Sequence, residues 1–301
     1  MEFLYLLEKI RIPGLNELML AVTTLGEETA FLVIGLVVFW CFSKRQGYYV
    51  MTVGLAGTVA SQWMKILCRI PRPWVQDPNF TILEQAREAA GGYSFPSGHT
   101  QSAVGTFGSI AATCKKKWLR VVCIVLAVLV GLSRMYIGVH TPADVLVGAL
   151  ISVVLIVAFY PLMQGRKDRT FLGLLYLALF SLCYLIFMEI ATFPADVDAH
   201  NLESAIKNAY TLIGCSCGLL VVYPLEKRFI HYSEKAVWWI QLIKIGAGLL
   251  LVLAVKEGLR SPLEAVFAHL TARAVRYFLI VVVAGLLWPL SFRYLNKLNK
   301  E

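Results

Sequence analysis

The chain has 301 residues, of which 58% are hydrophobic and 16% are charged, and its mean hydropathy is +0.68. Soluble domains usually carry about 25% charged residues, so this composition argues against a soluble two-domain α/β enzyme. The net charge is +9, but most basic residues lie in short loops between apolar runs, and the sequence contains no nucleic-acid-binding motif. We therefore expect an integral membrane protein with no nucleic-acid partner.

The first 26 residues mix charged and apolar side chains, among them Glu2, Glu8, Lys9 and Arg11. This mixture is typical of amphipathic helices that lie at the membrane interface, and it does not suggest a cleavable signal peptide. The seven cysteines fall mostly in apolar runs and form no CxxC pair. They predict neither a disulfide framework nor a metal site.

Apolar segments long enough to cross a bilayer occupy most of the remaining chain. They cover residues 27–43, 47–66, 98–114, 118–136, 143–163, 171–191, 204–224, 237–256 and 275–292. The sequence thus predicts an all-α, polytopic transmembrane bundle of about nine spans. We expect three regions: an interfacial segment at 1–26, a core at 27–163 that carries the polar motifs, and an additional four-helix region at 164–301.

The loops on one side of this expected bundle are basic. With nine spans, the positive loops at 43–47, 114–120, 164–170 and 225–236 share one side with the C-terminal tail, and such loops tend to be cytoplasmic. The acidic loop at 192–203 falls on the other side. The stretch 257–274 is the poor fit, because it lies outside but contains arginines. The polar stretches at 67–97 and 137–142 are expected on the outer face.

The first polar stretch, KILCRIPRP, runs from Lys65 to Pro73 at the end of the second expected span. Lys65 and Arg72 are seven residues apart, close to two helical turns, although the prolines are expected to end the helix before Arg72. Taken alone, the pair resembles the snorkelling lysine and boundary arginine that are common at helix ends. In either case two cations meet at the outer end of this span.

The second polar stretch, Pro96-Ser97-Gly98-His99, precedes the third expected span. Ser97 can cap a helix N-terminus, and Gly98 allows a ligand to approach the backbone. Helix N-termini favour anions, so His99 would lie at the rim of an anion site and could donate a proton there. An ordinary loop-to-helix junction with an interfacial histidine is an equally good interpretation of this stretch alone.

The third polar stretch, SRMYIGVHTPAD, runs from Ser133 to Asp144 between two apolar runs. His140 and Asp144 are four residues apart and would meet on one helical face. A carboxylate against one imidazole nitrogen fixes the tautomer and leaves the other nitrogen free to attack. A structural His–Asp pair at a helix start is the alternative, but such groups are costly at a membrane and favour a function.

Together the three stretches supply three cations, a helix N-terminus, an oriented nucleophile and a spare acid. Phosphoryl transfer requires this combination of positioning and charge neutralisation. No acidic cluster suited to a metal pair accompanies the set, so we expect neither metal nor cofactor, with side-chain cations in the place of Mg²⁺.

The pattern resembles the three-part motif of the type-2 phosphatidic acid phosphatase family over about residues 27–163. That family includes glucose-6-phosphatase, sphingosine-phosphate phosphatases, bacterial undecaprenyl diphosphate and phosphatidylglycerophosphate phosphatases, and vanadate haloperoxidases. Every motif position matches in order: Lys65-x6-Arg72-Pro73, Pro96-Ser97-Gly98-His99 and Ser133-Arg134-x5-His140-x3-Asp144.

The resemblance implies a metal-independent hydrolase in which His140 forms a phosphohistidine, Asp144 orients it and His99 protonates the leaving group. It also implies a phosphate cradle made of Lys65, Arg72, Ser97, Gly98 and Arg134. A lipid phosphate is the expected substrate, with membrane lipids as the surroundings, because the site would open near the headgroups.

Several alternatives stay open at this point. The chain could hold vanadate as a haloperoxidase does, act on a soluble sugar phosphate, or bind phosphate without turnover as a transporter or lipid-binding module. Neither the leaving group, the oligomeric state nor the role of the last four spans follows from the sequence. Glu189, near the outer end of the sixth expected span, could contact substrate or could be an ordinary boundary residue.

Overall fold

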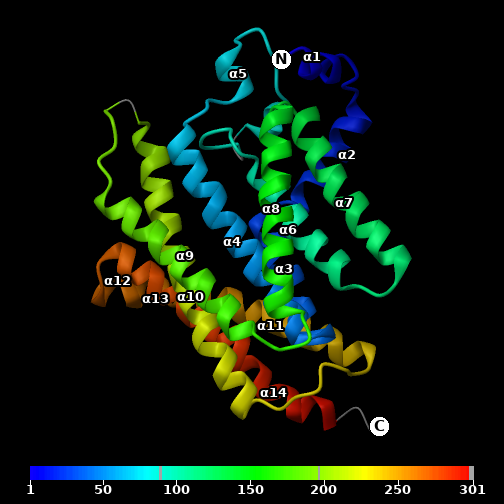
Figure 1. Ribbon diagram of the computed structural model, residues 1–301, viewed down its shortest axis with the longest axis vertical. Coiled ribbons are helices and arrows are strands. Elements are labelled where there is room, and N and C mark those ends of the chain that lie inside the picture. Colours follow the sequence, from blue (N-terminus) through cyan, green and yellow to red (C-terminus); the bar gives the residue numbers. More distant parts are fainter. Residues whose placement is uncertain (88–89, 196, 298–301) are drawn as a thin grey trace. The chain divides into compact units, whose positions relative to one another are not determined.

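The computed structural model describes residues 1–87, 90–195 and 197–297, and within these ranges every regular element is a helix (Figure 1). The all-α prediction is confirmed. The α-helices are α1 (Glu2–Lys9), α2 (Pro13–Thr24), α3 (Glu28–Val37), α4 (Lys44–Cys68), α5 (Pro73–Gln76), α6 (Gly98–Thr113), α7 (Lys117–Tyr136), α8 (Pro142–Met163), α9 (Thr170–Ile190), α10 (Ala199–Phe229), α11 (Trp238–Gly258), α12 (Arg260–Val266), α13 (His269–Val282) and α14 (Trp288–Leu295). Three short elements are η1 (Val38–Phe42), η2 (Glu84–Ala86) and η3 (Val283–Leu287).

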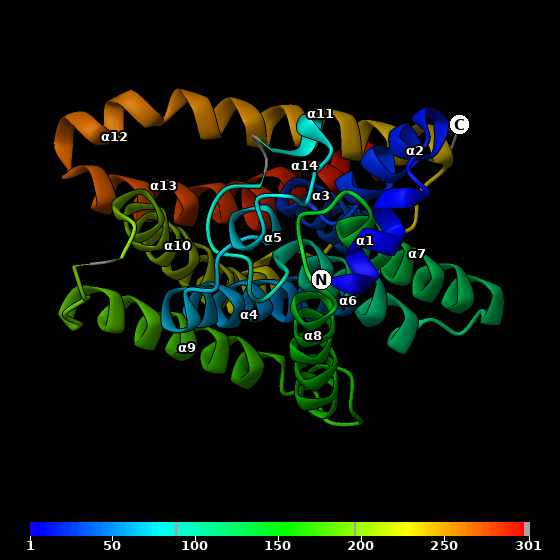
Figure 2. The same ribbon diagram turned by 90° about the horizontal axis from the view of Figure 1, so that it is seen from above.

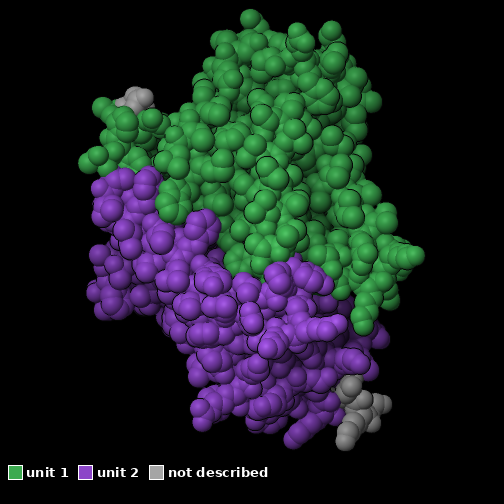
Figure 3. All heavy atoms as spheres, in the orientation of Figure 1, with its two compact units in different colours: residues 1–32, 56–159, 192–205 green, residues 33–55, 160–191, 206–301 purple. Residues whose placement is uncertain are grey.

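The chain divides into two compact units (Figure 3). The first unit comprises Met1–Leu32, Ala56–Phe159 and Thr192–Ala205, and the second comprises Val33–Leu55, Tyr160–Ala191 and Ile206–Glu301. All three polar motifs belong to the first unit. The expected division into regions at residues 26 and 163 stays a prediction. Those regions were defined by their expected roles, and the two compact units do not test these roles.

Six helical segments of the described residues are long and apolar enough to cross a membrane. They are Lys117–Tyr136, Pro142–Met163, Thr170–Ile190, Ala199–Phe229, Trp238–Val266 and His269–Leu295. A seventh is possible if Pro13–Thr24 and Glu28–Phe42, bent by 56° at their break, form one span. The expected count of about nine spans is therefore not confirmed, and neither is a purely interfacial role for α1 and α2.

Two of the expected spans, 47–66 and 98–114, correspond to α4 and α6, which are not among these six segments. Helix α6 has 16 residues, about 24 Å of helix, and is too short for a full span. Both helices are rich in small and polar side chains, of which Thr52, Ser61, Gln101 and Ser102 are buried. Their polarity is turned toward the protein interior instead of the lipid.

A further correction concerns residues 257–274, which we expected to be a loop. Most of this stretch is helical, because α12 covers Arg260–Val266 and α13 begins at His269. Its arginines lie on helices: Arg260 is within reach of Glu264 one turn later, at 3.6 Å, and Arg273 donates to Thr211 Oγ1 at 2.7 Å. One of these arginines is thus paired with an acidic side chain and the other with a hydroxyl.

In the first unit, α1 and α2 lie beside α7 (Figure 2), and the N-terminal segment contacts the chain on both sides of the α7–α8 connection. A cluster of Leu4, Phe80, Ile82, Met135 and Val145 joins α1 to the long loop after α5 and to α7 and α8. Arg11 Nε donates to Tyr136 O at 3.0 Å, and its Nη1 donates to Thr81 O at 2.9 Å. These contacts fix the end of α7 and the start of the third motif.

The second unit has its own core of aromatic side chains and a partly buried ion pair. Trp40 Nε1 donates to Ala284 O at 2.9 Å, and the Trp40 ring meets Phe292 edge-on. Lys44 Nζ lies 2.7 Å from Glu226 Oε1, whose side chain is buried. This unit contains none of the motif residues, so the site is described within the first unit alone.

Candidate functional site

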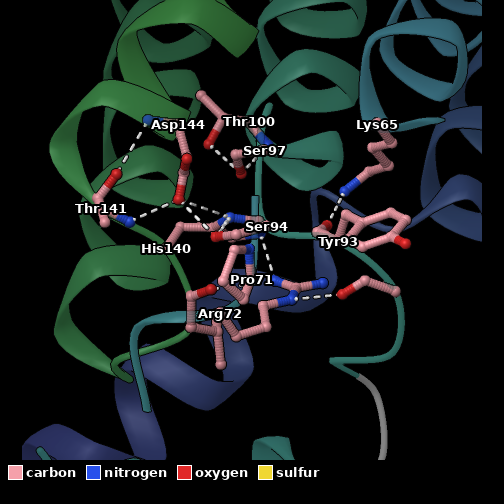
Figure 4. Close-up of polar contacts among 12 residues, drawn as sticks. Lys65, Pro71, Arg72, Tyr93, Ser94, Ser97, Thr100, His140, Thr141 and Asp144 are labelled. Atoms are coloured by element: carbon pink, nitrogen blue, oxygen red, sulfur yellow. Dashed lines mark hydrogen bonds and ion pairs between the residues drawn. The ribbon is translucent and has the colours of Figure 1, made fainter. Parts of the chain in front are cut away.

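The first motif leaves α4 at Cys68, and its two cations return to the chain that precedes α6. Lys65 Nζ donates to Tyr93 O at 2.5 Å. Arg72 is buried and donates from Nε to Gly92 O at 3.0 Å and from Nη2 to Gly91 O at 2.7 Å. These bonds to loop carbonyls hold both cations where the second and third motifs meet (Figure 4).

His140 is buried, and its Nε2 lies 2.9 Å from Arg72 Nη1. A guanidinium has only donors, so Nε2 must be the acceptor in this contact and must carry a lone pair. The ring proton then resides on Nδ1. The geometry therefore selects the tautomer in which Nε2 is the basic nitrogen, next to a permanent cation.

The opposite ring nitrogen faces a carboxylate and a hydroxyl. His140 Nδ1 lies 3.4 Å from Asp144 Oδ2 and 3.4 Å from Ser94 Oγ, while Ser94 donates to Asp144 Oδ2 at 2.6 Å. Thr141 N also donates to Asp144 Oδ2, at 2.7 Å, as Asp144 occupies the first turn of α8. The expected His–Asp pairing is thus present as a triangle that includes Ser94 (Figure 4).

The second motif begins α6 as expected, with Ser97 as the N-cap residue. Its hydroxyl accepts from Thr100 N at 3.4 Å and lies 2.9 Å from Thr100 Oγ1. Ser97 N donates to Asp144 O at 3.0 Å, and a Cβ at Gly148 would lie only 2.6 Å from Ser97 O. Gly148 thus allows α8 to pack against the start of α6, which places Asp144 beside the PSGH motif.

Arg134 lies in the last turn of α7 and is buried. Its Nη1 donates to Thr23 Oγ1 in α2 at 2.8 Å, whereas its Nε has no hydrogen-bond partner among the described residues. Gly138, with φ of +88°, then turns the chain toward His140 in a conformation that side-chain-bearing residues rarely adopt. A buried cation with an unused donor is suited to receive an anion.

A pocket of about 220 Å³ opens between these groups, entirely within the first unit. Six of the eight predicted site residues line it: Lys65, Arg72, Gly98, His99, Arg134 and His140. Its other lining residues come from the α2–α3 junction, from α4, from α6 and from Gly91. Ser97 and Asp144 are not among the lining residues. Ser97 caps α6, and Asp144 faces the Nδ1 side of the His140 ring, opposite to the Nε2 atom that Arg72 contacts.

Burial and the charges of the pocket keep the His140 ring neutral. Burial lowers the pKa of His140 well below its ordinary value of 6.5, and the cations of Arg72, Arg134 and Lys65 lower it further. Burial also lowers the pKa of Arg72 to about 10, opposed by the Asp144 carboxylate, so this guanidinium stays charged at neutral pH. The pocket therefore offers fixed positive charge next to an uncharged base.

Two residues of this arrangement were missed by the sequence reasoning. Ser94 stands three residues before Ser97 in a glycine-rich loop, and Thr23 lies far upstream in α2; neither carried a motif signal. Only the fold shows their contacts with Asp144 and Arg134. Among the described residues, no group of three or more His, Cys, Asp or Glu side chains could hold a metal ion. The expectation of a metal-free reaction itself stays a prediction.

The stretch that carries this geometry also matches a known family. Residues 45–168 match the PAP2 superfamily, and residues 210–301 match the PAP2 superfamily phosphatase transmembrane extension. The chain is 33% identical over 154 residues to phosphatidylglycerophosphatase B of Bacillus subtilis (strain 168), covering 46% of this chain and 70% of that relative. The chain belongs to the PAP2 superfamily.

Two further relatives carry the name undecaprenyl-diphosphatase. The chain is 29% identical over 129 residues to undecaprenyl-diphosphatase BcrC of Bacillus subtilis (strain 168), covering 42% of this chain and 64% of that relative. It is 28% identical over 152 residues to the undecaprenyl-diphosphatase of Sulfolobus acidocaldarius, covering 50% and 71%. No solved structure matches the chain.

The transmembrane extension accounts for much of the region that the motifs left uncovered. Together with the apolar helices, it identifies this PAP2 chain as an integral, multi-pass membrane protein. Glu189 lies in α9 of the second unit, where its side chain is a hydrogen-bond partner of Tyr210. Whether Glu189 also contacts substrate stays an open expectation.

Proposed function

We propose that this PAP2 protein is a membrane phosphatase that hydrolyses a phosphomonoester or diphosphate of a lipid through a phosphohistidine. The observation that carries the proposal is the contact between Arg72 Nη1 and His140 Nε2 inside a pocket shared with Lys65, Arg134 and His99. It supports a neutral nucleophilic nitrogen placed beside three cations. The names of the relatives support a lipid as the carrier of the phosphate.

In the first step, His140 Nε2 attacks phosphorus in line with the leaving oxygen. The P–O bond breaks as the P–N bond forms, and His99 gives a proton to the departing oxygen. Burial and the cations of the pocket lower the pKa of His99 to about 3, so His99 takes up this proton when the negatively charged phosphate is bound. The cations of Lys65, Arg72 and Arg134 neutralise the equatorial oxygens. The carboxylate of Asp144 stabilises the charge that develops on the His140 ring, whose proton stays on Nδ1.

In the second step, His99, now neutral, removes a proton from a water molecule that attacks phosphorus on the side vacated by the leaving group. The P–N bond breaks, the electron pair returns to His140 Nε2, and inorganic phosphate leaves. The protonated His99 is then restored for the next cycle. No residue of this scheme requires a metal ion, and the cations of the pocket supply the charge that Mg²⁺ supplies in other phosphoryl-transfer enzymes.

The test is phosphate release by purified protein in detergent, with undecaprenyl diphosphate, phosphatidate, phosphatidylglycerophosphate, a sphingoid phosphate and glucose 6-phosphate. We expect turnover of at least one lipid, undiminished by EDTA, and its loss in His140→Ala and Arg134→Ala. His269→Ala, which changes a histidine outside the pocket, is the matched control. Turnover of glucose 6-phosphate alone would favour a soluble sugar phosphate, and unchanged activity of His140→Ala would overturn the mechanism.

We further propose that the pocket opens on the non-cytoplasmic face. Cys68 is exposed at the end of α4 beside the first motif, and Cys114 follows α6 at its opposite end, next to a basic loop. Single-cysteine variants at these positions should differ in intact cells: a membrane-impermeant maleimide labels Cys68, and it labels Cys114 only after permeabilisation. The reverse pattern would place the pocket on the cytoplasmic face.

A further inference from the structure

The pocket continues past the phosphate-binding cations along one face of α4. Thr58, Ser61, Gln62 and Lys65 all line it, and their spacing of three, four and seven residues puts them on the same side of the helix. Thr58 lies about 10 Å from Lys65 along the helix axis, because each residue adds about 1.5 Å. A phosphate held at His140 therefore leaves this end of the pocket for another part of the substrate.

Helix α6 forms the facing wall with Gln101 and Ser102. The Gln101 amide reaches across to α4, where a Cβ at Gly57 would lie 1.9 Å from its Nε2. We call Thr58, Ser61, Gln62, Gln101 and Ser102 the polar subsite. All five side chains are uncharged, in contrast to the cradle beside them. Two helices thus contribute uncharged, buried or half-buried polar residues to a single pocket.

Three atoms of the polar subsite have no hydrogen-bond partner among the described residues: Ser61 Oγ, Gln101 Nε2 and Ser102 Oγ. Elsewhere on the same helices, Thr52 Oγ1 donates to Tyr48 O and Thr106 Oγ1 donates to Ser102 O, at 2.7 and 2.8 Å, whereas Ser109 Oγ and Tyr48 Oη also lack a partner in the described part of the chain but belong to residues that do not line the pocket. Buried polar atoms without partners are rare and costly. Rotation of these short side chains toward the pocket would give them a ligand to bind.

The absence of charge in the polar subsite decides between two kinds of ligand. A second phosphate group would find only Lys65 near the polar subsite, a cation already assigned to the first phosphate, in a pocket that Glu27 and Glu28 also line. Burial of a negative charge that lacks a cation of its own is strongly unfavourable. A hydroxyl group is neutral and both donates and accepts, which matches serine, threonine and amide side chains. An alkyl or prenyl chain would leave the polar atoms unpaired.

We propose that the polar subsite binds hydroxyl groups of the leaving group, so that the preferred substrate is the phosphate ester of a polyol, such as a glycerol- or sugar-bearing headgroup. This inference rests on the proposed function, since it assigns the leaving group of the same reaction. It goes beyond that function because it predicts which esters the protein discriminates against. These are phosphate esters whose leaving group is an apolar chain without hydroxyl groups.

The experiment compares glycerol 3-phosphate with n-propyl phosphate, which has the same carbon chain without hydroxyls. The kcat/KM values of the two compounds are measured. Where turnover is too slow, the two compounds are compared by their inhibition constants for hydrolysis of the best lipid of the panel. We expect the protein to prefer glycerol 3-phosphate by tenfold or more, because a site built to pair hydroxyls discriminates against analogues that lack them. Equal values for the two compounds would overturn the inference.

Ser61→Ala and Ser102→Ala should each reduce this preference about threefold or more, mainly through KM or the inhibition constant. The matched control is Ser109→Ala, because Ser109 is also a buried serine of α6 with an unpaired hydroxyl but does not line the pocket. An equal loss for both compounds in Ser61→Ala, or an equal change of preference in Ser109→Ala, would contradict a specific role.

Failure of the inference is distinguishable from failure of the proposed function. If no lipid of the panel is hydrolysed, the proposed function fails and the inhibition constants have no reaction to report on. If lipids are hydrolysed and glycerol 3-phosphate has no advantage over n-propyl phosphate, the phosphatase stands and only the polyol subsite is refuted.

Discussion

The Ser94 hydroxyl donates to Asp144 Oδ2 at 2.6 Å, whereas His140 Nδ1 lies 3.4 Å from the same oxygen. The closest partner of the Asp144 carboxylate is therefore a serine of the loop that leads to the second motif. Ser94 N also donates to Ile70 O at 2.8 Å, so the same residue ties that loop to the chain that leaves α4. Ser94 connects all three motifs, although none of them includes it.

Replacing Ser94 with alanine should lower kcat about tenfold and leave KM within about twofold, because the hydroxyl positions Asp144 and His140 without lining the pocket. Ser94→Thr, which keeps the hydroxyl, should restore part of the loss. Steady-state kinetics on the best lipid substrate measures both constants. A change in KM alone would show that Ser94 acts on substrate binding instead.

The two histidines should respond differently to the leaving group. His140→Ala removes the nucleophile and should abolish turnover of every substrate. His99→Ala removes the acid and should cost about 10²–10⁴ in kcat with a lipid alkoxide, but much less with p-nitrophenyl phosphate, whose leaving group needs no proton. Equal losses on both substrates in His99→Ala would argue against a role in protonation.

Two glycines at the start of α6 and on α8 should give opposite phenotypes. A Cβ at Gly148 would lie 2.6 Å from Ser97 O, so Gly148→Ala should destabilise the protein by about 1–3 kcal/mol through overpacking. A Cβ at Gly98 would meet nothing within 4 Å but would project into space that phosphate would fill, as Gly98 lines the pocket. Gly98→Ala should keep the melting temperature and raise KM. Thermal unfolding and kinetics of both variants provide the comparison.

Stability should depend on pH through His140. The folded protein lowers the pKa of this group, so below about pH 6.5 the unfolded chain binds a proton that the folded protein does not. Stability from this source is present above pH 6.5 and is lost as the pH falls toward the lowered value, by at most about 1.4 kcal/mol per pH unit. His140→Gln should flatten the acid side of a plot of melting temperature against pH. Parallel plots for the two proteins would refute the neutral, buried state.

Thr23 should matter for substrate binding although it lies outside residues 45–168, which match the PAP2 superfamily. Thr23→Val removes the acceptor of the 2.8 Å bond from Arg134 Nη1 and leaves a buried guanidinium without it. We expect KM to rise about three- to tenfold, with inhibition by vanadate weakened to a similar degree. Thr24→Val, next to it but exposed, is the control. If Thr23→Val lowers the melting temperature without any kinetic effect, Thr23 contributes to packing alone.

The local chemistry of the site could be predicted from the sequence because each motif is short. Proline after α4, serine before α6 and the four-residue spacing of His140 and Asp144 constrain neighbouring residues directly, and these features recur in the structure. The spans were predicted less well. Helices α4 and α6 are buried and polar, and hydropathy cannot distinguish a helix that faces protein from one that faces lipid.

The sequence by itself determined the membrane class, the helical content and most of the residues that line the proposed phosphate site. Only the tertiary structure decided which nitrogen of His140 is basic, that Ser94 and Thr23 support the charged groups, and that Ser97 and Asp144 stand behind the pocket instead of lining it. The physical reason is that these outcomes depend on contacts between segments up to 111 residues apart. Local spacing carries no information about such contacts until the helices have packed.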